Sequence, residues 1–269
     1  MTQKSRLDVL LVNRKLAESR SQAQRLVMAG QVRVNGQVVG KPAARVDESA
    51  ALTVDRGPRF VSRGGAKLQA AFDAFNLDVS GLICADVGAS TGGFTDCLLQ
   101  HGAAKVYALD VGKGILHWNL RKDARVVVME STNARYVEAL PEPVAFVSID
   151  ASFISLKILL PVIKNWFSAD EKTTQKNIVA LIKPQFEAGR KDVARGKGVV
   201  RDPEIHWRVL RDVLGFAQEA GYHLQGVVRS PVLGPKGNVE FLGWLALGER
   251  EKPQISVEEL VAQVLPPAP

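Results

Sequence analysis

The sequence of 269 residues has little of what builds metal centres or disulfide scaffolds. Its two cysteines, Cys84 and Cys97, exclude a disulfide framework and a Cys-rich zinc site. The four histidines show no metal-ligand spacing, so no metal is expected. No apolar run approaches the ~18 residues of a membrane helix, and the charged N-terminus is unlike a signal peptide. These absences predict a soluble protein of the reducing cytoplasm that does not act on membranes.

The composition is that of an ordinary globular protein, with 46% hydrophobic and 23% charged residues. The length allows one large domain or two of unequal size. Residues 1–60 hold eleven Lys/Arg and five Asp/Glu, a net of +6, whereas the whole chain has a net charge of +7. A small basic block ahead of a near-neutral remainder is typical of a polyanion-binding module. A solvated surface that happens to be basic is the alternative.

Residues 1–56 predict a small α+β domain. Ser5 can cap a first helix whose leucines repeat at helical spacing, and a second helix is expected from Ser19 or Ser21 to Ala29. Asn35-Gly36 between alternating apolar residues predicts a hairpin over residues 32–39. Two basic helices followed by this hairpin resemble the αL RNA-binding fold of ribosomal protein S-four, which implies RNA as a partner.

The pattern changes beyond a predicted linker at residues 57–62, and strands alternate with helices over residues 63–250. The expected strands are 82–87, 105–110, 125–129, 144–150, 178–182, 223–229 and 239–247, and the expected helices are 66–75, 93–101, 154–163 and 203–220. This alternation predicts an α/β fold with a seven-stranded, largely parallel sheet covered on both faces. A short loop before the last strand predicts an antiparallel edge strand. Residues 251–269 are expected to form a C-terminal tail.

The first strand of this domain leads into a glycine-rich turn, from Asp86 to Asp96. Such a turn lets a ligand approach the backbone, but its glycine spacing differs from the dinucleotide fingerprint G-x-G-x-x-G. Carboxylates beside the turn would repel a pyrophosphate and suit a cationic sulfonium ligand. Asp110 ends the second strand, where a ribose-binding carboxylate belongs in such folds. These features predict S-adenosylmethionine as the ligand, with a tight turn that binds nothing as the alternative.

Nine residues are expected to hold this ligand. They are Asp86, Gly88, Ser90, Thr91, Gly92, Gly93, Phe94, Asp110 and Asn133. Asn133 follows the third strand, where its amide could bond the edge of the adenine or cap a helix.

Four ionisable residues lie at the ends of predicted elements: Lys67, Asp150, Lys183 and Glu240. Asp150 and Lys183 end apolar strands, so they should be partly buried and need partners. The four residues lie in Ser-Arg-Gly-Gly-Ala-Lys-Leu, Ser-Ile-Asp-Ala-Ser-Phe, Leu-Ile-Lys-Pro-Gln-Phe-Glu and Asn-Val-Glu-Phe. The order and wording of these segments resemble the TlyA family over about residues 5–250. The resemblance implies a Rossmann-like, FtsJ/RrmJ-like methyltransferase that uses S-adenosylmethionine to 2′-O-methylate ribosomal RNA, in a family often named haemolysins.

The chemistry of that reaction explains the four residues. A ribose 2′-hydroxyl is a weak nucleophile and must lose its proton as the methyl group is transferred. Lys183 could accept the proton only if its pKa lay well below the free value of ~10.4. Alternatively, Lys183 stays charged and stabilises the developing alkoxide. Asp150 and Lys67 would position and tune it, and Glu240 would hold the lysines or the ribose.

Basic residues are expected to contact the phosphates of ribosomal RNA or ribosomal subunits. They are Arg6, Arg14, Lys15, Arg20, Arg25, Arg33, Arg59, Arg63, Arg190, Lys191, Arg195 and Lys197. The last four lie in residues 185–201, a basic loop interpreted as a lid over the RNA or as a mobile surface loop. Three rival functions are a membrane-active haemolysin, a non-catalytic RNA-binding or ribosome assembly factor, and a nucleotide-dependent dehydrogenase.

Overall fold

The computed structural model describes residues 3–55, 57–168, 176–248 and 255–265. It divides the chain into two units, residues 1–59 and 60–269, and the sequence analysis places this junction in the linker at 57–62. The N-terminal unit has its own hydrophobic cluster, and two further clusters lie in the C-terminal unit. Among the described residues, no helix is long and apolar enough to cross a bilayer.

The N-terminal unit combines two helices with two small antiparallel sheets. Its elements are β1 (Lys4–Arg6), α1 (Leu7–Asn13), α2 (Arg20–Met28), β2 (Val32–Val34), β3 (Gln37–Val38), β4 (Arg45–Asp47) and β5 (Leu52–Val54). β2 pairs with β3 and β5, and β1 pairs with β4. The predicted hairpin turn is confirmed: Asn35 and Gly36 have φ angles of 49° and 84°, which both residue types tolerate.

The sequence predicted the start of the second helix correctly but not the start of the first. The prediction that Ser5 caps the first helix is wrong, because Ser5 lies within β1 opposite Val46 and its hydroxyl donates to Glu48. The second helix starts as expected, since the Ser19 hydroxyl accepts a hydrogen bond from the backbone N–H of Gln22.

The C-terminal unit is built on a seven-stranded sheet. Its strands are β6 (Ile83–Val87), β7 (Lys105–Leu109), β8 (Val126–Met129), β9 (Phe146–Ile149), β10 (Asn177–Ile182), β11 (His223–Arg229) and β12 (Phe241–Ala246). All seven predicted strands are confirmed to within two residues at each end. The strand order is β11-β12-β10-β9-β6-β7-β8, and β12 alone runs against the others. β12 is antiparallel as predicted, but it lies between β10 and β11 and not at the edge, which buries its Phe241 and Leu242 completely.

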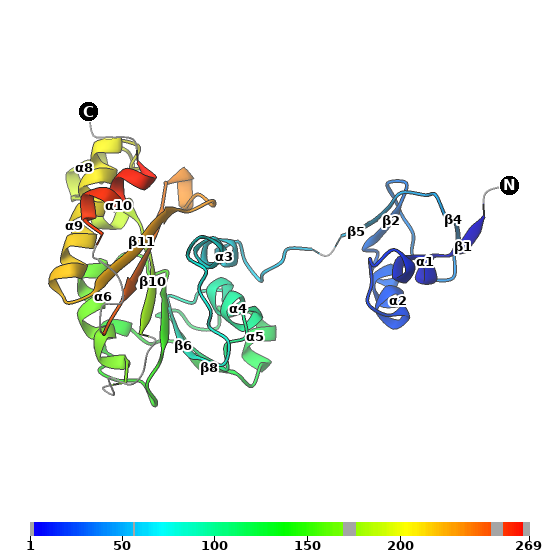
Figure 1. Ribbon diagram of the computed structural model, residues 1–269, viewed down its shortest axis with the longest axis horizontal. Coiled ribbons are helices and arrows are strands. Elements are labelled where there is room, and N and C mark those ends of the chain that lie inside the picture. Colours follow the sequence, from blue (N-terminus) through cyan, green and yellow to red (C-terminus); the bar gives the residue numbers. More distant parts are fainter. Residues whose placement is uncertain (1–2, 56, 169–175, 249–254, 266–269) are drawn as a thin grey trace. The chain divides into compact units, whose positions relative to one another are not determined.

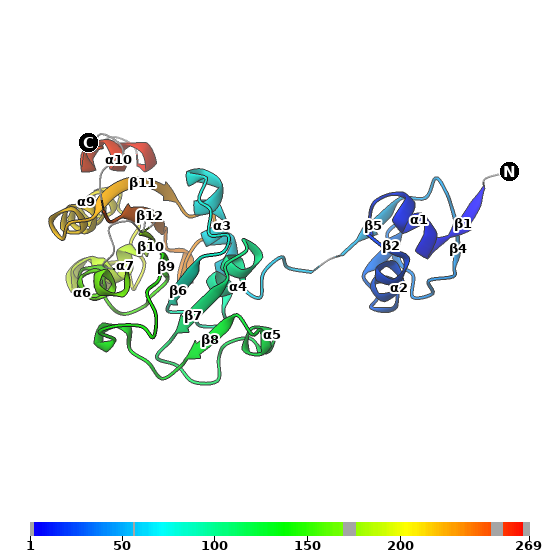
Figure 2. The same ribbon diagram turned by 60° about the horizontal axis from the view of Figure 1, so that its bottom comes forward.

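Helices cover both faces of this sheet (Figures 1 and 2). One face carries α3 (Gly64–Phe75), α4 (Gly93–Gln100) and α5 (Trp118–Lys122), and the other carries α6 (Leu156–Ile163), α9 (Pro203–Glu219) and α10 (Val257–Val264). Successive residues of a strand face opposite layers, as Cys84 and Ala85 of β6 do. The short helical turns are α7 (Pro184–Glu187), α8 (Arg190–Arg195), η1 (Ala134–Tyr136), η2 (Lys164–Trp166) and η3 (Pro235–Gly237).

Three segments contain helices that the sequence analysis did not expect. The first is α5, between β7 and β8. α7 and α8 occupy much of the predicted basic loop at 185–201. α10 lies within the predicted tail, and its Leu260 and Val261 are fully buried in the core shared with α9. Residues 251–254 and 266–269 of that tail lie outside the described residues.

Candidate active site

The site lies at the carboxyl ends of β6 and β9, where the strand order reverses direction. From β6 the sheet continues through β7 and β8 on one side and through β9 and β10 on the other. Open α/β sheets bind ligands at such a switch point. The backbone N–H of Asp150 donates to the carbonyl of Val87 at 2.8 Å. Gly88 has a φ angle of 84°, and a Cβ there would lie 2.7 Å from the carbonyl oxygen of Asp150, so glycine permits the two strand ends to meet.

A cavity of about 600 Å³ opens beside these strand ends, walled by the ends of β6 and β7 and by residues 132–135 and 150–155. The Asp110 carboxylate in its wall accepts the backbone N–H groups of Ser90 at 2.8 Å and Gly112 at 2.7 Å. Asn133 also lines the cavity, and its side-chain oxygen accepts the N–H of Arg135 at 3.2 Å, which caps η1. The volume lies in the range of small-molecule binding sites and accommodates a nucleoside.

A second cavity of about 290 Å³ contains all four members of the predicted catalytic set, Lys67, Asp150, Lys183 and Glu240. They come from α3, from the ends of β9 and β10, and from the residue before β12. The two cavities have Gly88, Ser90, Asp150 and Ser152 in common. A ligand in the larger cavity would therefore adjoin the four charged side chains.

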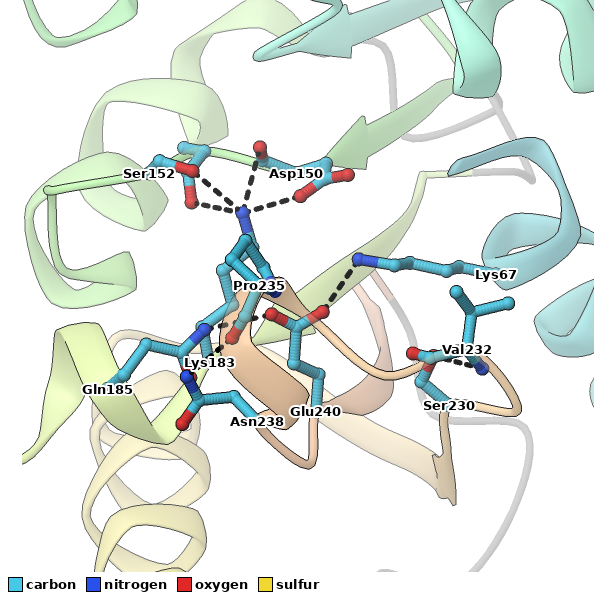
Figure 3. A network of polar contacts seen from close by, with 11 residues as sticks. Lys67, Asp150, Ser152, Lys183, Gln185, Ser230, Val232, Pro235, Asn238 and Glu240 are labelled. Atoms are coloured by element: carbon cyan, nitrogen blue, oxygen red, sulfur yellow. Dashed lines mark hydrogen bonds and ion pairs between the residues drawn. The ribbon is translucent and has the colours of Figure 1, made fainter. Parts of the chain in front are cut away.

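Lys183 Nζ is surrounded by oxygen atoms (Figure 3). It lies 2.6 Å from Asp150 Oδ1 and donates to the carbonyl oxygens of Asp150 and Ala151 at 3.2 and 3.0 Å and to Ser152 Oγ at 3.0 Å. An ammonium has three hydrogens to donate, so this arrangement suits the charged amine. The side chain is 7% exposed, and its charge lies in the wall of the smaller cavity.

Lys67 and Glu240 form a second ion pair, with 2.6 Å between Nζ and Oε2 (Figure 3). Their side chains are 9% and 0% exposed. The other oxygen of Glu240, Oε1, accepts a hydrogen bond from Gln185 Nε2 at 2.9 Å. A Cβ at Gly234 would lie 2.1 Å from the same oxygen, so the loop before β12 contacts this carboxylate closely. The four residues of the predicted catalytic set therefore form two ion pairs that face one cavity.

The structure does not bring Asp86 to either cavity. Asp86 is fully buried, and its carboxylate accepts hydrogen bonds from the hydroxyls of Thr95 at 2.6 Å and Ser148 at 3.2 Å. Burial raises the pKa of this carboxyl to about 7, and the charge of Asp150 contributes to the increase. Asp96 accepts the backbone N–H of Val61 at 2.8 Å. The predicted pair of carboxylates at the mouth of the turn is therefore wrong, and Asp110 and Asp150 are the carboxylates that line the larger cavity.

The glycine-rich turn serves the packing of the chain as much as ligand access. Gly88 and Ser90 line both cavities, and Thr91, Gly93 and Phe94 line the smaller one. Gly92 lines neither cavity, and a Cβ there would lie 2.1 Å from a methyl carbon of Leu120. A Cβ at Gly93 would lie 2.3 Å from the Ser62 hydroxyl, so these two glycines permit close contact with α5 and with the start of α3.

The short helix α7 connects several walls of the site, whereas the sequence analysis placed its residues 185–187 only in the predicted basic loop. The Phe186 ring lies 4.8 Å from the ring of Phe153, which lines the larger cavity, is 90% exposed and has a φ angle of 63°. The Glu187 carboxylate accepts the Ser155 hydroxyl at 2.6 Å and the backbone N–H of Leu156 at 2.7 Å. Burial raises the pKa of Glu187. These residues lie in the two sequence segments that carry Asp150 and Lys183. That proximity in sequence was the signal that could have identified them as part of the site.

Three of the predicted RNA-contacting residues also stabilise the N-terminal unit. Arg6 and Arg20 pair with the buried Asp8 at 2.9 and 3.0 Å, and Arg14 donates to the carbonyl of Ala50 at 2.6 Å. The predicted residues with exposed side chains are Arg14, Lys15, Arg20, Arg25, Arg33, Arg59, Arg63, Lys191, Arg195 and Lys197. Arg63 also lines the smaller cavity, and the side chain of Arg190 lies outside the described part of the chain.

Comparisons with known proteins agree with this geometry. The FtsJ-like methyltransferase family model matches residues 60–247, and the S4 domain model matches residues 5–52. The 16S/23S rRNA (cytidine-2′-O)-methyltransferase TlyA of Mycobacterium tuberculosis is 49% identical over 91% of both chains. Hemolysin A of Brachyspira hyodysenteriae is 42% identical over 88% of this chain and 98% of its own. A solved structure described as "Putative hemolysin from Streptococcus thermophilus" is 44% identical, covers 98% of this chain and 96% of its own, and gives a TM-score of 0.69.

These matches favour one of the functions that the sequence left open. The family model covers the whole sheet of the C-terminal unit, and it supports the methyltransferase prediction and not the dehydrogenase. The relatives match this chain over most of both its units. The chain belongs to the TlyA family of S-adenosylmethionine-dependent ribosomal-RNA 2′-O-methyltransferases, with an FtsJ-like catalytic domain preceded by an S4 domain.

Proposed function

We propose that this enzyme transfers the methyl group of S-adenosylmethionine to a ribose 2′-hydroxyl of ribosomal RNA, and that the transfer takes place in the smaller cavity. The observation that carries the proposal is the meeting of two ion pairs, from four segments far apart in sequence, in one cavity wall. That cavity shares Gly88 and Asp150 with a neighbour large enough for a nucleoside.

The residues of the larger cavity fit S-adenosylmethionine. The Asp110 carboxylate at the end of β7 is placed for ribose hydroxyls, and Val111 and Ile115 offer apolar surface to the adenine. Thr132 and Asn133 supply polar groups in the same wall. The carboxylates of Asp110 and Asp150 favour a cationic ligand. When bound there, the cofactor supplies an electrophilic methyl group on a positively charged sulfur.

Lys183 and Asp150 perform the proton chemistry at the shared wall. The Lys183 ammonium binds the 2′-oxygen and stabilises the negative charge that develops as the hydroxyl loses its proton. Asp150, 2.6 Å from Lys183 Nζ, is the carboxylate placed to accept that proton. Lys67, held by Glu240, supplies a further positive charge to the cavity and orients the target nucleotide.

RNA binding uses the phosphates and the target base. The exposed basic side chains of the N-terminal unit and of α8 contact phosphates, and this sequence-independent attraction supplies affinity. Phe153 stands exposed at the larger cavity, beside Phe186 in the wall of the smaller one. An exposed ring of this kind provides a stacking surface for a base withdrawn from its neighbours. Because its substrate is ribosomal RNA, we place the enzyme in the cytoplasm, with ribosomal subunits as its partners.

The test is to incubate the protein with methyl-labelled S-adenosylmethionine and one RNA substrate at a time. The substrates are small subunits, large subunits and free ribosomal RNA, all from cells that lack the enzyme. We expect the label on a ribose 2′-oxygen, which makes the adjoining phosphodiester resistant to alkali. A short RNA with a 2′-deoxy residue at the mapped position is the matched control and should accept no methyl group. Label on a base, or no label in any RNA, contradicts the proposal.

A further inference from the structure

Gln185 on α7 is a buried amide whose nitrogen has a hydrogen-bond partner and whose oxygen has none. The residue is 8% exposed, and its Nε2 donates to Glu240 Oε1 at 2.9 Å. Its Oε1 is the one buried side-chain nitrogen or oxygen, among the described residues, without a hydrogen-bond partner. Burying an unpaired carbonyl is costly, and an apolar side chain of similar size would avoid the cost. The presence of an amide at this position therefore indicates that the hydrogen bond from its nitrogen to Glu240 has a function.

The orientation of the Gln185 amide follows from the chemistry of its partner. A rotation that exchanged the amide oxygen and nitrogen would place two acceptors against each other, because a carboxylate only accepts. The donor must therefore face Glu240. With Lys67 on Oε2 and Gln185 on Oε1, each oxygen of this carboxylate has its own partner. Gly234 contacts the same group and limits its movement.

We infer that Gln185 is a positioning residue for methyl transfer, which fixes Glu240 and through it the place of the Lys67 ammonium in the smaller cavity. Gln185 does not line that cavity, so it acts through Glu240 and not on the RNA. It lies two residues after Lys183, so one short helical segment sets the geometry of both ion pairs. The inference rests on the proposed function, because it assigns Gln185 a part in that reaction.

The first experiment compares Gln185→Leu with Gln218→Leu, the same substitution on α9 outside the site. Methyl transfer by the unmodified protein is measured first. If the unmodified protein transfers no methyl group, the proposed function is contradicted, and this failure is distinct from a failure of the Gln185 inference. For Gln185→Leu we expect kcat to fall by about 10- to 100-fold, the cost of a loosened catalytic geometry. The Kd for S-adenosylmethionine, the KM for RNA and the Tm should stay near those of the unmodified protein, as all parameters should for Gln218→Leu.

The second experiment uses Gln185→Glu, with Gln218→Glu as its control. The new carboxyl would face Glu240, whose other oxygen is held by Lys67, and two carboxyls at this distance share a proton. The protonated form can donate to Glu240 as the amide does, whereas the ionised form repels it. The ratio of variant to unmodified kcat should therefore fall by about tenfold or more between about pH 6 and about pH 9. A purely structural role would not give this pH profile.

Three results would overturn the inference. They are a Gln185→Leu kcat within twofold of the unmodified value, a loss of kcat matched by an equal loss of cofactor binding, and a Gln185→Glu ratio that does not change with pH. If Gln185→Leu does not fold, Gln185→Met, which also lacks the donor, replaces it in the same comparison.

Discussion

The two units of the chain each bury a charged cluster, and the clusters differ in whether they leave room for a ligand. In the N-terminal unit, Asp8 accepts hydrogen bonds from Arg6, Arg20 and Gln24. These bonds hold the pKa of Asp8 far below its usual range, and the cluster ties the start of α1 to α2. In the C-terminal unit, the Lys67–Glu240 and Lys183–Asp150 pairs also satisfy each other, but all four side chains line a cavity.

Buried charge therefore does not by itself mark a catalytic centre. Removing charges from water is costly, so a buried carboxylate needs partners whatever its role. A catalytic group must in addition present one face to a ligand. From their residue type alone, Arg6 and Arg20 were predicted to contact RNA. The structure shows that both also pair with Asp8. We call the Asp8 cluster closed, because it lines neither cavity, and the two lysine–carboxylate pairs open, because they line the smaller one. Breaking the closed cluster should therefore lower the stability of the fold, and breaking the open cluster should lower the rate of methyl transfer.

The largest effect is expected from Lys183→Ala in the open cluster. Loss of the ammonium should lower the rate of methyl transfer by about 10²- to 10³-fold or more, because it removes the group that stabilises the developing charge. S-adenosylmethionine should still bind in calorimetry, since Lys183 does not line the larger cavity. Lys183→Arg keeps a positive charge that cannot be deprotonated, and it should retain more activity than the alanine variant. Turnover retained by Lys183→Ala would refute the assignment, and an Arg variant as inactive as Ala would favour Lys183 as the base.

A smaller effect, on stability, is expected from Asp8→Ala in the cluster of the N-terminal unit. The arginines left behind are 41% and 56% exposed and can turn to water, so we expect a loss of about 2 kcal/mol. Because the pKa of Asp8 is lowered, its contribution is complete at neutral pH and disappears as the pH falls below that of an unfolded Asp, ~3.9. Hydrogen exchange in α1 and α2 would measure the loss, with the exposed Asp55→Ala as control. Faster exchange confined to the sheet of the C-terminal unit would contradict it.

The sequence predicted the C-terminal fold well because its strands are short apolar runs bounded by turns and its helices have apolar residues at helical spacing. α10 was missed, although Val257, Leu260, Val261 and Val264 have that spacing and Ser256 forms a capping box with Glu259. The position of β12 was a different kind of error. Which strands become neighbours depends on pairing between segments that are distant in sequence. A local sequence pattern therefore does not predict the strand order.

The candidate site could be predicted where its residues are charged. Lys67, Asp150, Lys183 and Glu240 are ionisable residues at element ends, and such groups require partners. Gln185 and Phe153 carry no charge, so composition and spacing gave them no weight. Asp86 was misplaced for another reason: a sequence shows a carboxylate beside a turn but not which layer of the sheet its side chain faces.

The smallest effect concerns Asp86, which is as buried as Asp8 but has hydroxyls in place of cations as partners. Its pKa is raised to about 7, the opposite of the shift at Asp8. An unfolded Asp ionises near ~3.9, so between that pH and about 7 the unfolded chain is ionised at this position while the folded chain keeps the proton. The contribution of Asp86 to stability should therefore fall as the pH rises through this window and then level off.

Asp86→Asn removes this dependence, because the amide does not ionise and still offers an acceptor and a donor to the two hydroxyls. One unit of pKa difference corresponds to about 1.4 kcal/mol, and relaxation around the buried group reduces the full value. The stability of Asp86→Asn relative to the unmodified protein should thus rise by about 1–2 kcal/mol between about pH 5 and about pH 8. Urea unfolding at a series of pH values measures it, with the exposed Asp212→Asn on α9 as control. A relative stability that stays flat or falls would mean that Asp86 is ionised in the folded protein, as Asp8 is, and that hydroxyl partners can replace cations around a buried carboxylate.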